Sequence, residues 1–340
     1  MTLLYDGIGS NGLAFIADQR TETCTGIGGV YRHWAFGRAC LGQEWQKALR
    51  IAVREYKTPH LNTKQCKALT PELAILLKTY NIKTLIVLQS PPARGAESVH
   101  HNAWTVATGR TDNPYGWAGT CEDRGDYFLC PILHPGTYEW AYWWLIRRWM
   151  CRALSVARGD IHPFVWPTRL CPYDPAYLAV DIETNMKRDI ISCIGLGTSR
   201  GACTFNWDTY QVAGTELVEP GRSESDEVYV RYMLASNIPK VGHNFSFDVH
   251  ELRRRGIEVN GEIHDTLLLC KSIYGQYRRG LQQVAAIEGC IEPWKSLYKP
   301  KRVRKGQDPW VADPEGTRAY NTKDVIATGL IWESLSEKLA

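Results

Sequence analysis

Short apolar runs alternate with helix-like patterns along the first half of the chain. Runs typical of buried strands occupy residues 13–17, 84–89 and 127–133. Apolar positions at helical spacing occur at residues 43–56, 71–80 and 138–154. Because strands alternate with helices, the pattern predicts a parallel sheet with helices on both faces, which is an α/β/α sandwich.

The second half of the chain predicts a different arrangement of strands and helices. Strand-like runs occupy residues 178–182, 190–197, 202–207 and 240–242, and helical patterns occupy 225–234, 246–255, 265–274, 281–288 and 317–339. A Thr-Ser-Arg-Gly turn joins the second and third of these strands, which favours antiparallel pairing. Both halves therefore belong to the α/β class.

A proline-rich stretch separates the two halves. Residues 158–175 read RGDIHPFVWPTRLCPYDP, with four prolines and no periodic apolar pattern. We expect a linker here, with one domain over residues 1–157 and a second over residues 176–340.

Composition limits the classes of protein that the chain can belong to. Apolar residues make up 44% of the 340 residues and charged residues 22%, which is typical of globular domains. No apolar run reaches the ~18 residues that a membrane span needs, and no secretion signal opens the chain. The 11 cysteines include no C-x-x-C pair, which favours reduced thiols in a cytoplasmic protein over a disulfide framework or a local zinc site.

Basic residues gather in three places although the net charge is only +4. These clusters lie at residues 253–255, 278–279 and 295–305. Each suits contacts with phosphate groups, and each is equally compatible with a solvated charged face.

Four carboxylates of the second half stand at positions that suggest chemistry. Asp181 and Glu183 end an apolar strand, and a spacing of two puts both side chains on one face. Two carboxylates this close repel each other, and a divalent metal would remove that cost. Asp248 lies in the first turn of a helix, four residues after Asn244, where an acid can also simply complement the helix dipole. Asp324 shares a helix face with Tyr320, four residues earlier.

Taken in order, these residues form a recognisable set. They are Asp181-Ile-Glu183, Asn244-x-x-x-Asp248 and Tyr320-x-x-x-Asp324, with His264-Asp-Thr-Leu267 and Gly280-Leu-Gln-Gln-Val-Ala285 between them. Over about residues 176–340 the chain resembles the DEDDy subgroup of DnaQ-like 3′–5′ exonucleases, which includes the proofreading domain of family A DNA polymerases.

The resemblance implies a fold, a cofactor and a set of roles. The fold would be a ribonuclease H-like mixed sheet, and two Mg²⁺ or Mn²⁺ ions would be held by Asp181, Glu183, Asp248 and Asp324. Tyr320 would orient the attacking water, and nucleoside 5′-monophosphates would leave from the 3′ end of DNA. The residues expected to contact the substrate are Ile182, Thr184, Asn244 and Phe247; Phe245 is an alternative to Phe247 for stacking on a base.

The first half carries a second resemblance, to the bacterial-type branch of the uracil-DNA glycosylase superfamily over about residues 10–155. The residues that carry it are Ala17-Asp18, Pro59-x-x-Asn62 and His134-Pro135-Gly136. The resemblance implies that Asp18 positions a water, Asn62 reads a flipped base and His134 stabilises the uracil anion. Gln19-Arg20 replaces the expected Gly-Pro, and the cluster cysteines of that branch are absent. We therefore favour a DNA-binding or docking role without catalysis.

The sequence thus predicts an exonuclease acting on single-stranded or frayed DNA 3′ ends, in a bacterial or phage-infected cell. Because few residues follow Asp324, we expect a proofreading subunit for a separate DNA polymerase, or an excised fragment. Two alternatives stay open. One is a DNA- or polymerase-binding module without activity, and the other is an exonuclease that trims RNA.

Overall fold

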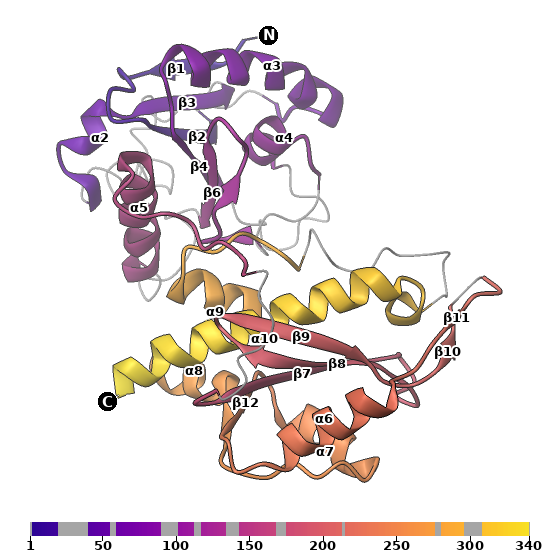
Figure 1. Ribbon diagram of the computed structural model, residues 1–340. Helices are drawn as coiled ribbons and strands as arrows, with labels where there is room; N and C mark the ends of the chain where they lie inside the picture. The colour runs from indigo at the N-terminus through magenta and orange to yellow at the C-terminus, as the bar shows by residue number, and fades with distance from the viewer. Residues whose placement is uncertain are drawn as a thin grey trace. The chain divides into compact units, whose positions relative to one another are not determined.

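The structure, a computed structural model, describes most of the chain in two compact units. The described residues are 2–19, 40–54, 59–89, 101–111, 117–133, 143–167, 175–212, 215–275, 280–295 and 308–339. The first unit comprises Met1–Phe164 with Cys290–Glu292, and the second Val165–Gly289 with Pro293–Ala340 (Figure 1). No helix within the described residues has the length and apolar character needed to cross a membrane.

The described part of the first unit contains a six-stranded sheet in the order β1-β3-β2-β4-β6-β5. The strands are β1 (Leu4–Asp6), β2 (Leu13–Gln19), β3 (Leu49–Arg54), β4 (Thr84–Gln89), β5 (Glu122–Asp123) and β6 (Phe128–Leu133). The four central strands run parallel, whereas β1 and β5 pair antiparallel at the two edges. This confirms the predicted parallel sheet and adds three strands to it, β3 in the interior and β1 and β5 at the edges.

Helices cover both faces of this sheet, as the alternating pattern predicts. They are α2 (Glu44–Lys47), α3 (Thr63–Thr79), α4 (Asn102–Thr108) and α5 (Trp143–Arg158). Ala14 and Ile16 of β2 point into a core with Leu73 of α3 and Trp104 of α4. Helix α5 packs against β2, β4 and β6, and Figure 1 shows it on the other side of the sheet.

The helix expected over residues 43–56 is wrong. Within residues 43–54, the described part of this range, only α2 is helical. The chain then forms β3, which is hydrogen-bonded to β1 on one side and to β2 on the other. The β-branched Ile51 and Val53 suit a strand buried on both faces, and pairing on two sides overrides a weak helical pattern. The helix expected at 71–80 begins earlier, at Thr63, and contains Pro71. The start of the helix expected at 138–154 lies outside the described residues.

The second unit contains a five-stranded mixed sheet within its described residues, in the order β13-β12-β7-β8-β9. The strands are β7 (Leu178–Thr184), β8 (Ile191–Thr198), β9 (Gly201–Asn206), β12 (Lys240–Gly242) and β13 (Ile263–Asp265), and a small hairpin joins β10 (Tyr210–Gln211) to β11 (Val218–Glu219). Strands β8 and β9 pair antiparallel, which confirms that prediction, and β7 also pairs antiparallel with β8. Strand β12 runs parallel to β7 and to β13.

Helices on the two faces of this sheet determine where the side chains of β7 point. The helices are α6 (Glu224–Ala235), α7 (Ser246–Arg254), α8 (Thr266–Tyr274), α9 (Leu281–Glu288) and α10 (Pro314–Leu339), with a short 3₁₀ turn η3 (Pro309–Val311). Val180 and Ile182 pack into a core with residues of α6 and α7. Because side chains alternate along a strand, Asp181 and Glu183 face the side covered by α10 (Figure 1).

A glycine on β8 permits the close approach of α10. Gly195 pairs with Asp181 across the sheet. A Cβ atom on Gly195 would lie 2.1 Å from Oδ1 of Asn321 and 2.6 Å from Cγ2 of Val325, both on α10. The absence of a side chain at this position therefore allows α10 to pack directly above the acidic end of β7.

We predict that Gly195→Ala destabilises the second unit, because the added methyl overpacks the contact between β8 and α10. The expected loss is about 1–3 kcal/mol in the free energy of unfolding, measured by denaturant titration. Val228→Ala, at an α6 side chain that is 64% exposed, is the control and should change stability by less than about 0.5 kcal/mol. Equal stability of Gly195→Ala and the wild type would contradict the close packing.

Candidate metal centre

Three acidic side chains from two elements converge beside the end of β7. Asp181 and Glu183 come from β7, and Asp324 comes from α10. One carboxylate oxygen of each lies within 4.8 Å of the others. Glu183 and Asp324 are 8% and 4% exposed, so water screens their repulsion poorly. This arrangement brings together three of the four carboxylates that the sequence singled out.

The fourth carboxylate, that of Asp248, lies at the start of α7 and faces β7. Its Oδ1 accepts a hydrogen bond from the backbone N–H of Ile182 at 3.0 Å. The backbone amide of Ile182, a residue expected to contact the substrate, is thus hydrogen-bonded to Asp248 in this structure. Burial raises the pKa of Asp248 to about 7, against the lowering effect of the Ile182 hydrogen bond.

Electrostatic repulsion within this cluster would be relieved by a bound cation. Burial raises the pKa of Asp181 well above its ordinary value, and the carboxylates of Glu183, Asp324 and Asp248 raise it further. Hard carboxylate oxygens are the ligands that Mg²⁺ and Mn²⁺ prefer. The donor set of Asp181, Glu183 and Asp324 thus fits a divalent metal ion.

A lysine that the sequence placed only within a basic cluster also belongs to this site. The ammonium of Lys295 donates to Oδ2 of Asp324 at 2.5 Å and to the phenol oxygen of Tyr320 at 2.6 Å. The indole Nε1 of Trp294 donates to the other oxygen of Asp324 at 2.5 Å. Burial lowers the pKa of Lys295, but the charge of Asp324 and the contact with Tyr320 outweigh it and raise the pKa overall.

A buried glutamine fixes the backbone that carries this lysine. Oε1 of Gln282 accepts from the backbone N–H of Trp294 at 3.2 Å and of Lys295 at 2.9 Å. Gln282 is 2% exposed and lies in the Gly-Leu-Gln-Gln run of α9. That run is the sequence signal for the support, whereas the pairing of Lys295 with a residue 29 positions away left no local pattern.

Asn321 is a second residue that sequence reasoning missed. Its Nδ2 donates to Oδ2 of Asp181 at 2.8 Å and to the backbone oxygen of Asp181 at 3.1 Å. The hydroxyl of Thr204 on β9 donates to Oδ1 of Asn321 at 3.0 Å, which fixes the orientation of the amide. Asn321 therefore positions Asp181, and its only sequence signal is its place directly after Tyr320.

Tyr320 and Asp324 lie one turn apart on α10, as their spacing predicts. Tyr320 is 7% exposed and its ring meets that of Trp310 edge-on at 5.3 Å. Burial raises the pKa of the Tyr320 phenol, and the neighbouring Asp324 carboxylate adds to that rise. The phenol thus stays protonated near neutral pH and can donate a hydrogen bond.

Three of the residues expected to contact a substrate are near the site carboxylates in the sequence: Thr184 follows Glu183, and Asn244 and Phe247 precede Asp248. Thr184 is partly buried, at an irregularity in the pairing of β7 with β8. Asn244 is exposed, with a left-handed φ of 64°, and its N–H donates to Oδ1 of Asp265 at 3.0 Å. Phe247 is partly buried under the guanidinium of Arg188, 5.0 Å from the ring centre. Phe245 is fully buried in the core, so it is Phe247 that remains available for stacking.

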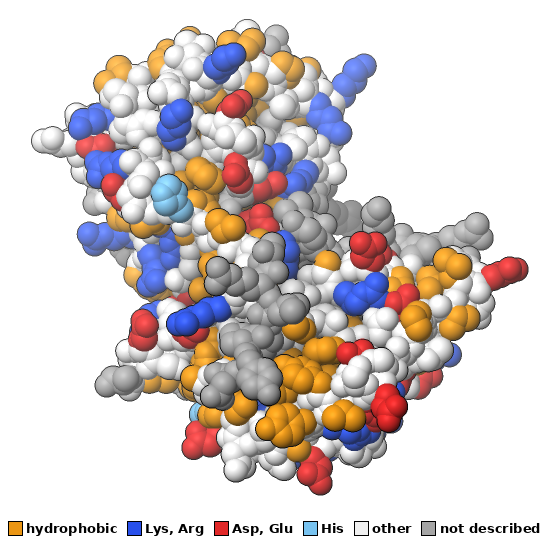
Figure 2. Space-filling view, viewed as in Figure 1, with side chains coloured by type: hydrophobic (Ala, Val, Ile, Leu, Met, Phe, Trp, Pro, Cys, Tyr) orange, Lys and Arg blue, Asp and Glu red, His pale blue; other side chains and the backbone are white. Residues whose placement is uncertain are grey.

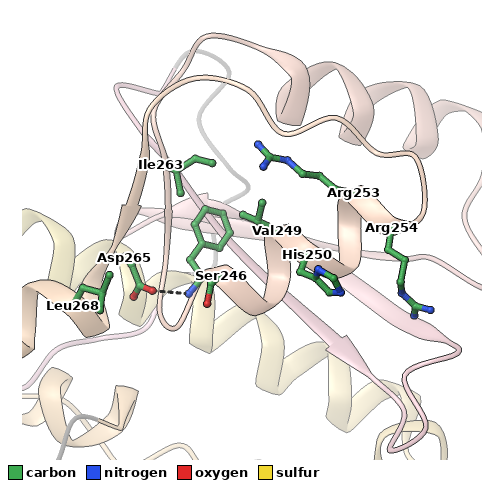
Figure 3. Close-up of a pocket in the computed structure, with 9 residues that line it drawn as sticks. Ser246, Val249, His250, Arg253, Arg254, Ile263, Asp265 and Leu268 are labelled. Carbon is green, nitrogen blue, oxygen red and sulfur yellow. Dashed lines mark hydrogen bonds between the residues drawn. The ribbon is translucent and has the colours of Figure 1, made fainter.

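A hollow of about 660 Å³ lies between α7 and α8 (Figure 3). It is lined by Phe245, Ser246, Val249, His250, Arg253, Arg254, Ile263, Asp265 and Leu268. None of the four site carboxylates lines it. Figure 3 shows Asp265 bonded to the turn that opens α7, where it accepts from the N–H of Phe245 at 3.0 Å. Asp265 thereby fixes the helix start that carries Asp248.

The described arginines of the basic clusters form ion pairs and hydrogen bonds within the protein. Arg254 and Arg255 bind the buried Glu251 at 2.9 and 2.6 Å, and Arg253 donates to the backbone oxygen of Val259 at 2.9 Å. Residues 278–279 and 296–305 lie outside the described part. On the face drawn in Figure 2, the described acidic and basic side chains are interspersed. These contacts favour a structural role for residues 253–255.

In the first unit, two candidate residues contact helix starts. The Asp18 carboxylate accepts from the N–H of Ala103 at 2.6 Å, at the beginning of α4, and burial raises its pKa to about 6. Asn62 caps α3 in a reciprocal pair with Gln65, with two hydrogen bonds of 2.9 Å. His134 lies outside the described residues. Both described side chains therefore have structural contacts.

Comparisons with known proteins give only weak structural similarities for this chain. No protein-family model and no curated protein matches the chain. The chain is similar to a solved structure described as the apo form of the nuclease, with a TM-score of 0.32 and 18% identity over 48% of this chain and 72% of that one. It is also similar to the POL domain of Pol1 from M. smegmatis in complex with DNA primer-template and dNTP, with a TM-score of 0.27 and 17% identity over 47% of this chain and 24% of that one.

We predict that, with the protein in EDTA, the stability contributed by Asp248 falls as the pH rises from about 4 to 7. The pKa of Asp248 rises from 3.8 to about 7 on folding, so the folded state binds more protons than the unfolded state in this window. Stability from this group is full below pH about 4 and is lost as the pH passes 7. Thermal unfolding across this range is the measurement.

Asp248→Asn isolates this contribution, because Asp18 also has a raised pKa and gives a slope of the same sign. The amide keeps an oxygen for the Ile182 N–H but cannot titrate. Between pH 4 and 7, the wild type should therefore lose melting temperature relative to the variant. A slope as steep as that of the wild type would show that Asp248 does not hold this proton.

Proposed function

We propose that the second unit is a metal-dependent 3′–5′ exonuclease that releases nucleoside 5′-monophosphates from DNA. The observation that carries the proposal is the meeting of Asp181, Glu183 and Asp324, with Asp248 and Tyr320 beside them. An acidic cluster of this kind can hold a divalent ion, and phosphodiester hydrolysis is a reaction that such ions promote.

Each side chain has a distinct part in this proposal. Asp181, Glu183 and Asp324 hold Mg²⁺ or Mn²⁺, and Asp248 completes the set for two ions. When bound, such ions activate water and neutralise charge on the departing 3′ oxygen. The protonated phenol of Tyr320 orients the attacking water, with Glu183 as the acceptor. Asn321 holds Asp181 in one orientation.

The proposed substrate is a single-stranded or frayed DNA 3′ end. Phe247 is only partly buried in the first turn of α7, and Asn244, just before that helix, is exposed, so both suit contacts with the terminal nucleotides. A separate DNA polymerase would supply the mispaired end, in the cytoplasm of a bacterial or phage-infected cell. An RNA-trimming exonuclease and a binding module without activity are the alternatives.

We predict that the full chain shortens a 5′-labelled DNA oligomer from its 3′ end, and that Asp181→Asn does not. Single-stranded and 3′-recessed oligomers would be compared in Mg²⁺, Mn²⁺ and EDTA, with product ladders resolved on gels. The asparagine keeps the size of Asp181 but removes its charge from the cluster, so metal binding and cleavage should fall to background.

The matched control for Asp181→Asn is Glu224→Gln, which neutralises an exposed acid at the start of α6. This control should retain full activity. A matched RNA oligomer separates the two nuclease alternatives. Binding of DNA without shortening by the wild type would favour the binding module and contradict the proposed activity.

For the first unit we propose a DNA-binding or docking role without glycosylase activity. The observation that favours it is the contact of the Asp18 carboxylate with the Ala103 amide, which commits a carboxylate oxygen to the start of α4. Asn62 is likewise committed to capping α3. One oxygen of each side chain is thus engaged in a structural contact.

We predict that the full-length Asp181→Asn variant releases no uracil from single-stranded DNA. This variant suppresses the proposed exonuclease, so alkali-sensitive abasic sites would report glycosylase activity alone. A 5′-labelled oligomer with one uracil should stay intact after alkali treatment. Strand cleavage at the uracil position would overturn the non-catalytic assignment.

A further inference from the structure

The Lys295 ammonium lies where a cation of the acidic cluster is expected. Its Nζ is 2.5 Å from Oδ2 of Asp324, and Asp324 is one of the three carboxylates that converge. The other oxygen of Asp324 accepts from Trp294 Nε1 at 2.5 Å. Both oxygens of this carboxylate are therefore engaged by donors of the same short segment.

A divalent ion and this ammonium cannot share Oδ2 of Asp324 without strong repulsion. Mg²⁺ binds carboxylate oxygen at about 2.0–2.1 Å. With Nζ 2.5 Å from the same oxygen, the two cations would be no more than about 4.6 Å apart. In a site this buried, like charges at such a separation repel strongly. The neutral Trp294 N–H carries no such cost and can remain on Oδ1.

We propose that Lys295 is a resident counter-cation that gives up Asp324 when a divalent ion is bound, and so sets the affinity of the metal centre. In the absence of metal, Lys295 neutralises one carboxylate of a cluster that would otherwise repel itself. This inference rests on the metal centre of the proposed function, and it does not require that the protein cleave DNA.

The geometry around Lys295 suits such an exchange. Gln282 fixes the backbone at this residue, whereas the side chain has a flexible four-carbon stem and is 30% exposed. The ammonium also has a second acceptor, the phenol oxygen of Tyr320 at 2.6 Å. Lys295 can thus leave Asp324 and keep a hydrogen-bond partner, which lowers the cost of the exchange.

The test measures Mn²⁺ binding to the full chain without DNA, by titration calorimetry and by electron paramagnetic resonance of free Mn²⁺. Lys295→Met removes the competing charge and should tighten Mn²⁺ binding by roughly tenfold or more. Lys295→Arg keeps a cation and should stay within about threefold of the wild type. In EDTA, the methionine variant should melt at a lower temperature than the wild type and gain more from added Mn²⁺.

Several outcomes would overturn the proposal. Unchanged or weaker Mn²⁺ binding by Lys295→Met, with a native circular dichroism spectrum, would show that Lys295 does not compete. If that variant does not fold, Lys295→Gln keeps a polar donor and should show the same tightening. Absence of Mn²⁺ binding by the wild type would overturn the metal centre and the exchange together. Mn²⁺ binding without DNA cleavage would overturn only the proposed function.

Discussion

The burial of several carboxylates at one point is the constraint on which the second unit depends. Asp181, Glu183 and Asp324 place oxygens within 4.8 Å of one another where water has little access. Burial and this crowding raise the pKa of Asp181, so proton or cation uptake is the expected response. The donors of Lys295 and Asn321 at the same carboxylates partly offset the repulsion.

The fold achieves this crowding with ordinary packing rules. Alternation along β7 buries Val180 and Ile182 on the side of α6 and α7, which leaves the two acids on the side of α10. Gly195 then lets α10 approach closely enough for its Asp324 to join them. Apolar packing thus supplies the stability against which a locally unfavourable cluster can be maintained.

The sequence predicts what depends on local periodicity and misses what depends on distant partners. The strands β7, β8 and β9 and the shared face of Tyr320 and Asp324 follow from spacing alone. The local pattern predicts a helix where β3 forms, because the pairing of β3 with β1 and β2 is not local. Lys295 was missed for the same reason, since its partner is 29 residues away. The local sequence around a lysine in a basic run does not indicate which distant acidic residue it pairs with.

Each of the two units contains buried acidic side chains, but the balance of charge around them differs. Asp18 is a single carboxylate near Arg54, and it accepts the N–H of Ala103, so one charge meets one opposite charge and a helix start. At Asp324, the Lys295 ammonium faces a group of three carboxylates, and one positive charge cannot balance them. The first arrangement is complete as it stands, whereas the second has excess negative charge that a divalent cation can neutralise. That difference in charge balance is the physical reason why we propose a metal site in the second unit.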